Sequence, residues 1–214
     1  IAGFVPYVLD QSAVLLLLVL VVAGPFACGE LLADVADLLG LIAYAAEARP
    51  ELRRHLSVQA SASSPEAVAY YAREFGVKRA VLPRVLTLPQ IAALTKKAGV
   101  ETEVFIFGGL CVMAEGRCAL SSYVTGKSPN VDGVCSPASH VRYEEEGGER
   151  VSKLGGVTIN RFSADEAAGY PTLCKGRFRA EGKSGYLFEE PTSLNAIALI
   201  PDLIKAGVKA VKIE

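Results

Sequence analysis

The stretch Ala80–Phe107, AVLPRVLTLPQIAALTKKAGVETEVFIF, predicts a strand, a helix and a second strand. Ala80-Val81-Leu82 is a short apolar run, and Leu88–Ala98 has the length and pattern of a helix. Glu103–Phe107 is again apolar and reads as the next strand. Strands separated by helices of this length are typical of βαβ units with a parallel sheet.

The same alternation extends in both directions along the chain. Upstream, Pro50 stands where a helix should end, and Ser63-Ser64 before Pro65 are typical of a helix start. Downstream, the last part of the chain again predicts a helix followed by a strand. The further predicted elements are helices over Leu31–Ala48, Pro65–Phe75 and Leu194–Ala206, and strands over His55–Gln59 and Lys209–Ile213. The sequence therefore predicts an α/β fold.

A long irregular segment interrupts this order. Residues 108–188 are rich in Gly, Ser, Pro and Cys, and include a charged, hairpin-like stretch at Arg142–Arg150. In a parallel barrel the loops that follow the strands form the functional face. We therefore expect three parts: residues 1–107 as the first portion of a barrel, 108–188 as a Cys-rich insertion, and 189–214 as a returning helix and strand.

Composition limits the classes of function. The chain has 214 residues, 51% of them hydrophobic, and 22 Lys and Arg against 23 Asp and Glu, a net charge of −1. This balance gives no global electrostatic reason to bind nucleic acid, although a local basic patch stays open. We expect no nucleic-acid partner.

One apolar stretch raises the question of a membrane. Val14–Val22 is a run of Val and Leu, which Gly24-Pro25 interrupts and no Lys or Arg flanks. A membrane span needs about 20 apolar residues, so a buried barrel element is favoured over an anchor. We expect no membrane span and a cytoplasmic location. Because the sequence starts at Ile1 and stops within a predicted strand, we also expect a piece of a longer protein.

Four of the five cysteines, Cys111, Cys118, Cys135 and Cys174, lie in the irregular segment. Six, sixteen and thirty-eight residues separate them in turn, and no CxxC pair occurs. Spacing alone leaves an iron–sulfur cluster and ordinary buried thiols about equally open, with zinc as a lesser alternative. Cys28 lies in the apolar N-terminal stretch and is interpreted as core packing.

The neighbours of these cysteines suit a cluster. Glycine lets backbone approach closely, so that amide groups can point at sulfur. Cationic side chains would offset the negative charge of a thiolate-bound cluster. The glycines are Gly108, Gly109, Gly116, Gly126, Gly133 and Gly176, and the cations are Arg117, Lys175 and Arg177.

Other polar residues offer weaker candidates. Gln59, Arg84 and Glu214 lie at or beyond predicted strand ends, where Arg84 could pair with a substrate carboxylate or form an ordinary salt bridge. Ser121-Ser122-Tyr123 reads as turn caps with a tyrosine packed beside the cysteines, and substrate contact is the alternative. A serine protease needs Ser, His and a carboxylate together, but only His55 and His140 exist, and neither GxSxG nor HExxH occurs.

The segment Gly109–Ala138, GLCVMAEGRCALSSYVTGKSPNVDGVCSPA, closely resembles the collagenase-like peptidase family U-32. The resemblance runs from about Leu31 to Glu214 and is most specific over Leu110–Arg177. One branch of the family is the most similar, the branch of oxygen-independent ubiquinone biosynthesis, and Ser139 replaces a Cys that RNA-hydroxylating relatives usually carry nearby. Further matching segments are His55–Ala62, Val81–Leu86, Asn160-Arg161, Gly169–Arg177 and Glu189–Asn195.

This resemblance implies a partial TIM-like (β/α) barrel with a Cys/Gly-rich insertion that binds a cluster. It implies a [4Fe-4S] cluster on Cys111, Cys118, Cys135 and Cys174, and a homologous partner of the same family in a heterodimer. The pair would hydroxylate a small aromatic precursor of ubiquinone without O₂, with prephenate as the oxygen donor. A cluster with every iron bound by thiolate favours electron transfer over Lewis-acid chemistry. The alternatives are a peptidase, an RNA-hydroxylating enzyme and a non-catalytic subunit that only positions a partner.

Overall fold

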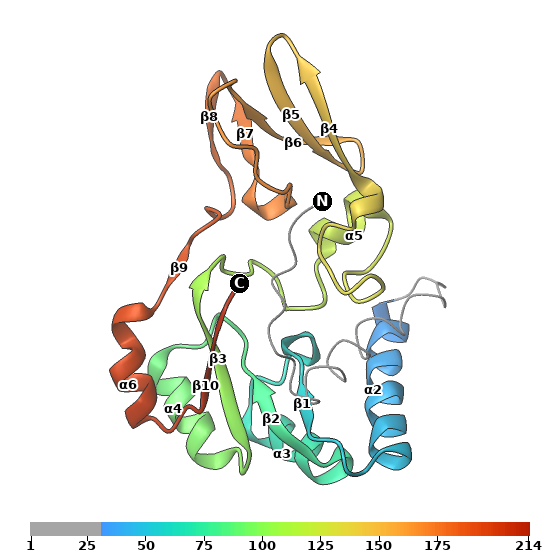
Figure 1. The fold of residues 1–214 in the computed structure, drawn as a ribbon, viewed down its shortest axis with the longest axis vertical. Helices are drawn as coiled ribbons and strands as arrows, with labels where there is room; N and C mark the ends of the chain where they lie inside the picture. The colour runs from blue at the N-terminus through green and yellow to red at the C-terminus, as the bar shows by residue number, and fades with distance from the viewer. Residues whose placement is uncertain (1–30) are drawn as a thin grey trace.

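The computed structural model describes residues 31–214 of the protein (Figure 1). The apolar run Val14–Val22 and Cys28 lie outside these described residues, so the interpretations given for them stay untested. No helix in the described part of the chain is long and apolar enough to cross a membrane.

A parallel sheet forms the lower half of the molecule in Figure 1. Its strands are β1 (Arg54–Leu56), β2 (Val77–Val81), β3 (Glu101–Gly108) and β10 (Ala210–Ile213), in the order β1-β2-β3-β10. All three pairings between them are parallel, which confirms the predicted βαβ units. The short strand β9 (Leu194–Asn195) runs antiparallel beside the end of β3. Strands in chain order are also the arrangement within a (β/α) barrel, and the partial barrel stays a prediction.

Within residues 31–214, four α-helices accompany this sheet: α2 (Leu31–Ala48), α3 (Pro65–Phe75), α4 (Leu88–Lys97) and α6 (Ile200–Lys205). The start of α3 follows from its sequence, because the Ser64 hydroxyl accepts a hydrogen bond from the Ala67 amide at 3.1 Å and Pro65 occupies the first turn. Apolar side chains from strands and helices then form one core, with Val68, Leu94 and Val104 almost fully buried.

The insertion forms the upper half of the molecule in Figure 1. It contains the short helix α5 (Ala119–Thr125), a three-stranded antiparallel sheet and a separate hairpin. The sheet confirms the predicted hairpin near Arg142–Arg150 and adds a third strand to it. Its strands are β4 (Val141–Glu146), β5 (Glu149–Leu154) and β6 (Val157–Phe162), and the hairpin is β7 (Arg177–Ala180) with β8 (Lys183–Tyr186).

Two predicted elements are wrong in part. The strand expected over His55–Gln59 ends at Leu56, because Ser57 caps a 3₁₀ turn, η1 (Val58–Ala60), through its hydroxyl. The helix expected from Leu194 to Ala206 instead begins with β9 and a 3₁₀ turn, η4 (Ile197–Leu199), and α6 follows. The Ala196 amide donates to the Ile106 carbonyl at 2.7 Å, so pairing with β3 replaces the first helical turns.

Candidate functional site

The four cysteines of the insertion lie in loops at the carboxyl edge of the parallel sheet. Cys111 comes three residues after β3, and Cys118 is the N-cap of α5. Cys135 precedes the 3₁₀ turn η2 (Ala138–His140), and Cys174 lies within the turn η3 (Leu173–Lys175). Cys118 is buried, Cys111 and Cys174 are half-buried, and Cys135 is exposed.

Contacts outside the sulfur atoms bring these four loops together. The Ser121 hydroxyl on α5 donates to the Cys135 carbonyl, which links α5 to the third cysteine loop. The Lys175 ammonium donates to the Leu110 carbonyl at 2.6 Å, which links the loop of Cys174 to that of Cys111. Helix α5 also packs against η3. Segments up to 65 residues apart in the sequence therefore meet at one place.

Electrostatic interactions between the thiols also indicate that the four cysteines lie close together. The pKa of Cys135 is raised to about 12, chiefly by burial and then by the thiols of Cys118, Cys111 and Cys174, in that order. Burial is also the largest cause that raises the pKa values of Cys111 and Cys174, and both are affected by Cys118. Although Cys135 is exposed as a whole residue, its thiol is desolvated, which is consistent with a sulfur atom that faces the other cysteines.

One backbone amide contacts a cysteine sulfur, and one glycine allows a close loop contact nearby; that glycines direct amides at the sulfur atoms stays a prediction. The Ser121 amide donates a hydrogen bond to the Cys118 sulfur at 3.4 Å. Gly116 adopts a φ of +77°, and a Cβ atom there would lie 2.9 Å from the Gln59 carbonyl oxygen. Only glycine therefore fits at this position, where the loop between Cys111 and Cys118 crosses the end of η1.

A single metal ion and an iron–sulfur cluster make different demands on the positions of their ligands. Within residues 31–214, no three His, Cys, Asp or Glu side chains are arranged to hold one metal ion. A tetrahedral zinc site needs its ligands within about 2.3 Å of one atom, whereas a cubane binds each cysteine to a different iron and needs wider spacing. The four thiols lie near one another, since Cys118, Cys111 and Cys174 all contribute to raising the pKa of Cys135.

A buried ion pair lies beside this site. The Arg84 guanidinium meets the Glu115 carboxylate at 2.5 Å, and the two side chains are only 11% and 7% exposed. The Arg84 amide also donates to Glu115 at 3.0 Å, and the guanidinium stacks over the Phe105 ring at 3.6 Å. Burial raises the pKa of Glu115, an effect that Arg84 opposes. Arg84 also lowers the pKa values of Cys111 and Cys135, so its positive charge acts on the cysteines.

Two of the three residues predicted at the strand ends meet, and the third contacts the loop that precedes Cys135. Arg84 lies 3.5 Å from the Glu214 carboxylate, and the Gln59 amide donates to the Gly133 carbonyl at 3.3 Å. Of the two roles expected for Arg84, the structure therefore shows the salt bridge. The Nε atom of Arg84 is buried and has no hydrogen-bond partner among the described residues. Glu115 was missed by sequence reasoning, because a lone Glu in a glycine-rich loop carries no pattern.

Of the three cationic residues expected near the cysteines, only Lys175 interacts with one of them in the described part of the chain. Lys175 lowers the pKa of Cys174 against the larger effect of burial. Arg177 instead pairs with Glu166 at 2.9 Å, and Arg117 forms no hydrogen bond with a cysteine among the described residues. Tyr123 is 86% exposed, so the expectation that it packs beside the cysteines is wrong.

The two histidines give no support to a serine-protease site. His140 meets the hydroxyl of its neighbour Ser139 at 3.0 Å, and this pair is exposed. No carboxylate in the described part of the chain hydrogen-bonds to His140 to orient it, as a catalytic triad requires. His55 lies on β1 within the sheet.

Comparison with known proteins identifies relatives. The family model described as Peptidase family U32 matches residues 32–214. The tRNA hydroxylation protein P of Escherichia coli (strain K12) is 31% identical over 193 residues, which cover 82% of this chain and 42% of that protein. Its counterpart from Haemophilus influenzae is 32% identical over 199 residues, with the same coverage.

A third relative has a different description. The uncharacterized protease MJ0090 of Methanocaldococcus jannaschii is 37% identical over 91 residues, which cover 40% of this chain and 22% of the relative. No solved structure matches the chain. The chain spans less than half the length of these curated relatives.

Proposed function

This chain belongs to peptidase family U32, and we propose that Cys111, Cys118, Cys135 and Cys174 hold a [4Fe-4S] cluster in an O₂-independent hydroxylase. The observation that carries the proposal is that four cysteines from loops far apart in sequence meet at one place, through the contacts of Ser121 with Cys135, of Lys175 with Leu110, and of α5 with η3. The cluster, when bound, would supply one-electron transfer.

The residues around the thiols have roles that suit such a centre. Thiolates in an apolar setting are unfavourable unless positive charge or hydrogen bonds compensate them. The Ser121 amide donates to the Cys118 sulfur, and Lys175 and Arg84 supply positive charge near the other cysteines. The Arg84–Glu115 pair places two further buried charged groups beside this site.

For the substrate, we propose a small aromatic precursor of ubiquinone, with prephenate as oxygen donor and a homologous family member as partner in a heterodimer. Support comes from the segments Gly169–Arg177 and Glu189–Asn195 and from Ser139, which resemble the ubiquinone branch.

A second candidate is RNA hydroxylation. It is favoured by the two relatives described as tRNA hydroxylation proteins, which cover 82% of the chain.

Peptidase activity is a third candidate, supported by the family description and by one relative. The exposed Ser139–His140 pair, however, lacks the carboxylate of a catalytic triad among the described residues.

One experiment separates these candidates. Cells that carry the whole protein, a deletion of it, or its Cys174→Ser variant are grown without oxygen, and both quinone intermediates and tRNA nucleosides are quantified by mass spectrometry. The proposal expects the deletion and Cys174→Ser to accumulate an under-hydroxylated quinone precursor, with nucleosides unchanged. Loss of hydroxylated nucleosides with normal quinone would establish the RNA candidate in its place.

A further inference from the structure

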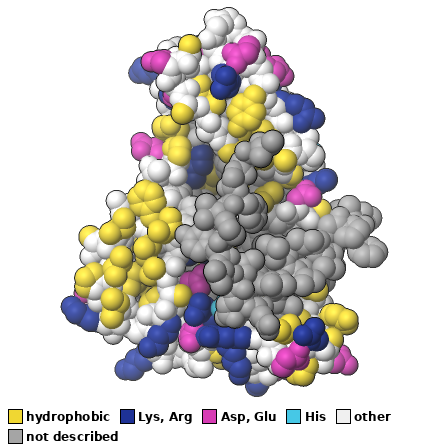
Figure 2. Space-filling view, in the orientation of Figure 1, with side chains coloured by type: hydrophobic (Ala, Val, Ile, Leu, Met, Phe, Trp, Pro, Cys, Tyr) yellow, Lys and Arg dark blue, Asp and Glu magenta, His cyan; other side chains and the backbone are white. Residues whose placement is uncertain are grey.

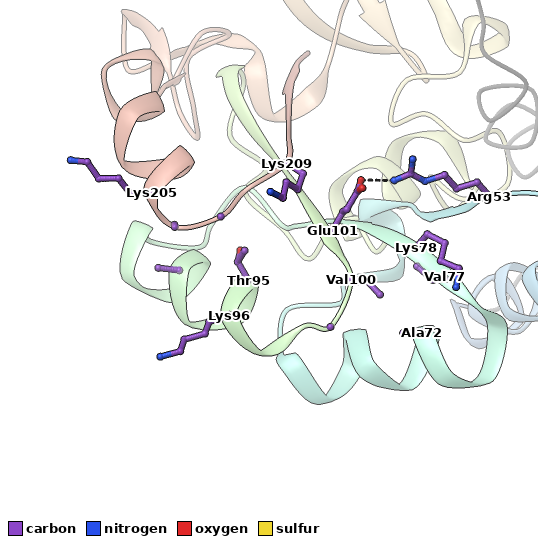
Figure 3. A pocket seen from close by; sticks show the side chains of 14 residues that line it. Arg53, Ala72, Val77, Lys78, Thr95, Lys96, Val100, Glu101, Lys205 and Lys209 are labelled. Atoms are coloured by element: carbon purple, nitrogen blue, oxygen red, sulfur yellow. Dashed lines mark ion pairs between the residues drawn. The ribbon is translucent and has the colours of Figure 1, made fainter.

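A wide groove lies at the end of the parallel sheet opposite to the cysteines. Its walls come from the residues that precede or begin β1, β2, β3 and β10 and from α3 and α4, whereas the cysteine loops leave from the other end of β3 (Figure 3). The groove has a volume of about 1230 Å³. Nothing in the proposed hydroxylation uses this edge of the sheet.

Among the described residues, five cations and one carboxylate line the groove, although the whole chain has a net charge of −1. The carboxylate, Glu101, is already engaged by Arg53 at 2.5 Å and by Arg79 at 2.8 Å. Lys205 pairs with Asp202 at 3.3 Å. The remaining cations, Lys78, Lys96 and Lys209, form no ion pair within the described residues. In Figure 2, dark blue side chains gather along this lower edge of the molecule.

The floor between these cations is small and aliphatic. Ala72, Val77, Ala92 and Val100 line it, together with Gly99 and Gly207. No aromatic side chain of residues 31–214 belongs to the lining, although single-stranded nucleic acids use such side chains as stacking platforms. The lining also offers no arginine free of an ion pair for a bidentate phosphate contact, since Arg53 is paired with Glu101.

The volume, charge and aliphatic lining of the groove favour some classes of ligand over others. Sites for small molecules usually occupy about 300–1,000 Å³ and enclose their ligand, so this open groove suits an extended chain better. Lysine ammonium groups attract carboxylates and raise association rates without demanding a fixed geometry. An aliphatic floor would meanwhile accept small apolar side chains.

We propose that this basic groove docks an acidic segment of a partner protein, with carboxylates paired to Lys78, Lys96 and Lys209 and small apolar side chains on the aliphatic floor. The surface is separate from the cysteine site, so a partner held here leaves the carboxyl edge of the sheet free. The inference stands apart from the identity of the substrate and from the presence of a cluster.

The test is direct binding with defined probes. A fluorescently labelled peptide of alternating Glu and Ala is titrated with the whole chain, and fluorescence anisotropy is read at low and moderate salt. The matched probes are a Lys–Ala peptide and a single-stranded oligouridylate of equal charge to the acidic peptide. The proposal expects binding of the acidic peptide that salt weakens, and weaker or no binding of the other two.

Two double variants make the test specific to the groove. Lys78→Ala with Lys209→Ala removes two unpaired cations from the lining, whereas Lys97→Ala with Lys183→Ala removes two exposed cations that do not line it. The first pair should weaken binding of the acidic peptide about fivefold and the second should leave it unchanged. Equal losses in both pairs, tighter binding of the oligouridylate, or no binding of the acidic peptide would each overturn the proposal.

Discussion

The buried pair of Arg84 and Glu115 gives the sharpest prediction about stability. The change Glu115→Gln keeps the size of the side chain and removes the charge that compensates the Arg84 guanidinium. Removing one partner of a buried ion pair typically costs about 3–5 kcal/mol, because an unpaired charge remains in the interior. Glu214 lies 3.5 Å from Arg84 and retains part of the compensation, so we expect a loss of about 2–3 kcal/mol.

The assay is urea unfolding of the metal-free chain, followed by circular dichroism, so that loss of a cluster does not enter the result. With a slope of about 2 kcal/mol per molar urea, the midpoint should fall by about 1 M. The control Glu51→Gln breaks the exposed pair of Arg49 and Glu51 and should cause no measurable shift. Replacing both buried partners, as Arg84→Met with Glu115→Leu, should restore part of the loss. Equal shifts for Glu115→Gln and Glu51→Gln would refute the reasoning.

Three further results are expected. Cys174→Ser should abolish retention of iron after anaerobic reconstitution while Cys28→Ser retains it, as read from the visible absorption; the reverse would mean that the wrong thiols were chosen. Gly155→Ala should destabilise by about 2–3 kcal/mol more than Gly156→Ala in urea unfolding, because a Cβ at the first would lie 1.7 Å from a carbonyl oxygen of α5 while the second is open; similar losses would show that α5 does not pack there. In the metal-free chain, Cys135 should react with iodoacetamide much more slowly at pH 8 than in urea, since its folded pKa of about 12 keeps the thiol protonated, and the rate should rise as the pH approaches 12. Equal rates in the folded and unfolded chain would show that the thiol is not desolvated.

Local signals in the sequence account for the elements that were predicted well. The helix over Pro65–Phe75 has a serine cap, a proline in its first turn and a glycine at its end, all of which act within the segment itself. Strands β6, β7 and β8 were not predicted, because they are short, carry many polar residues and are defined by pairing with other strands. The stretch Leu194–Ala206 has helical residues, but contact with β3 decides its first part.

In the candidate site, too, some residues could be predicted from the sequence and others could not. The cysteines could be predicted from their position in a glycine-rich insertion and from family resemblance. Glu115 could not, because its role depends on Arg84, which lies 31 residues away in sequence. The basic groove could not be predicted from the sequence either. Lys78, Lys96 and Lys209 come from three separate segments, and acidic residues elsewhere offset their charge, so that the net charge is −1.

Iron and acid-labile sulfide, measured on protein purified without oxygen, test the central claim most directly. If the four thiols bind a cubane, the protein should be brown and contain about four irons and four sulfides per chain. A colourless protein that carries stoichiometric zinc, or neither iron nor sulfide after reconstitution, would contradict the account.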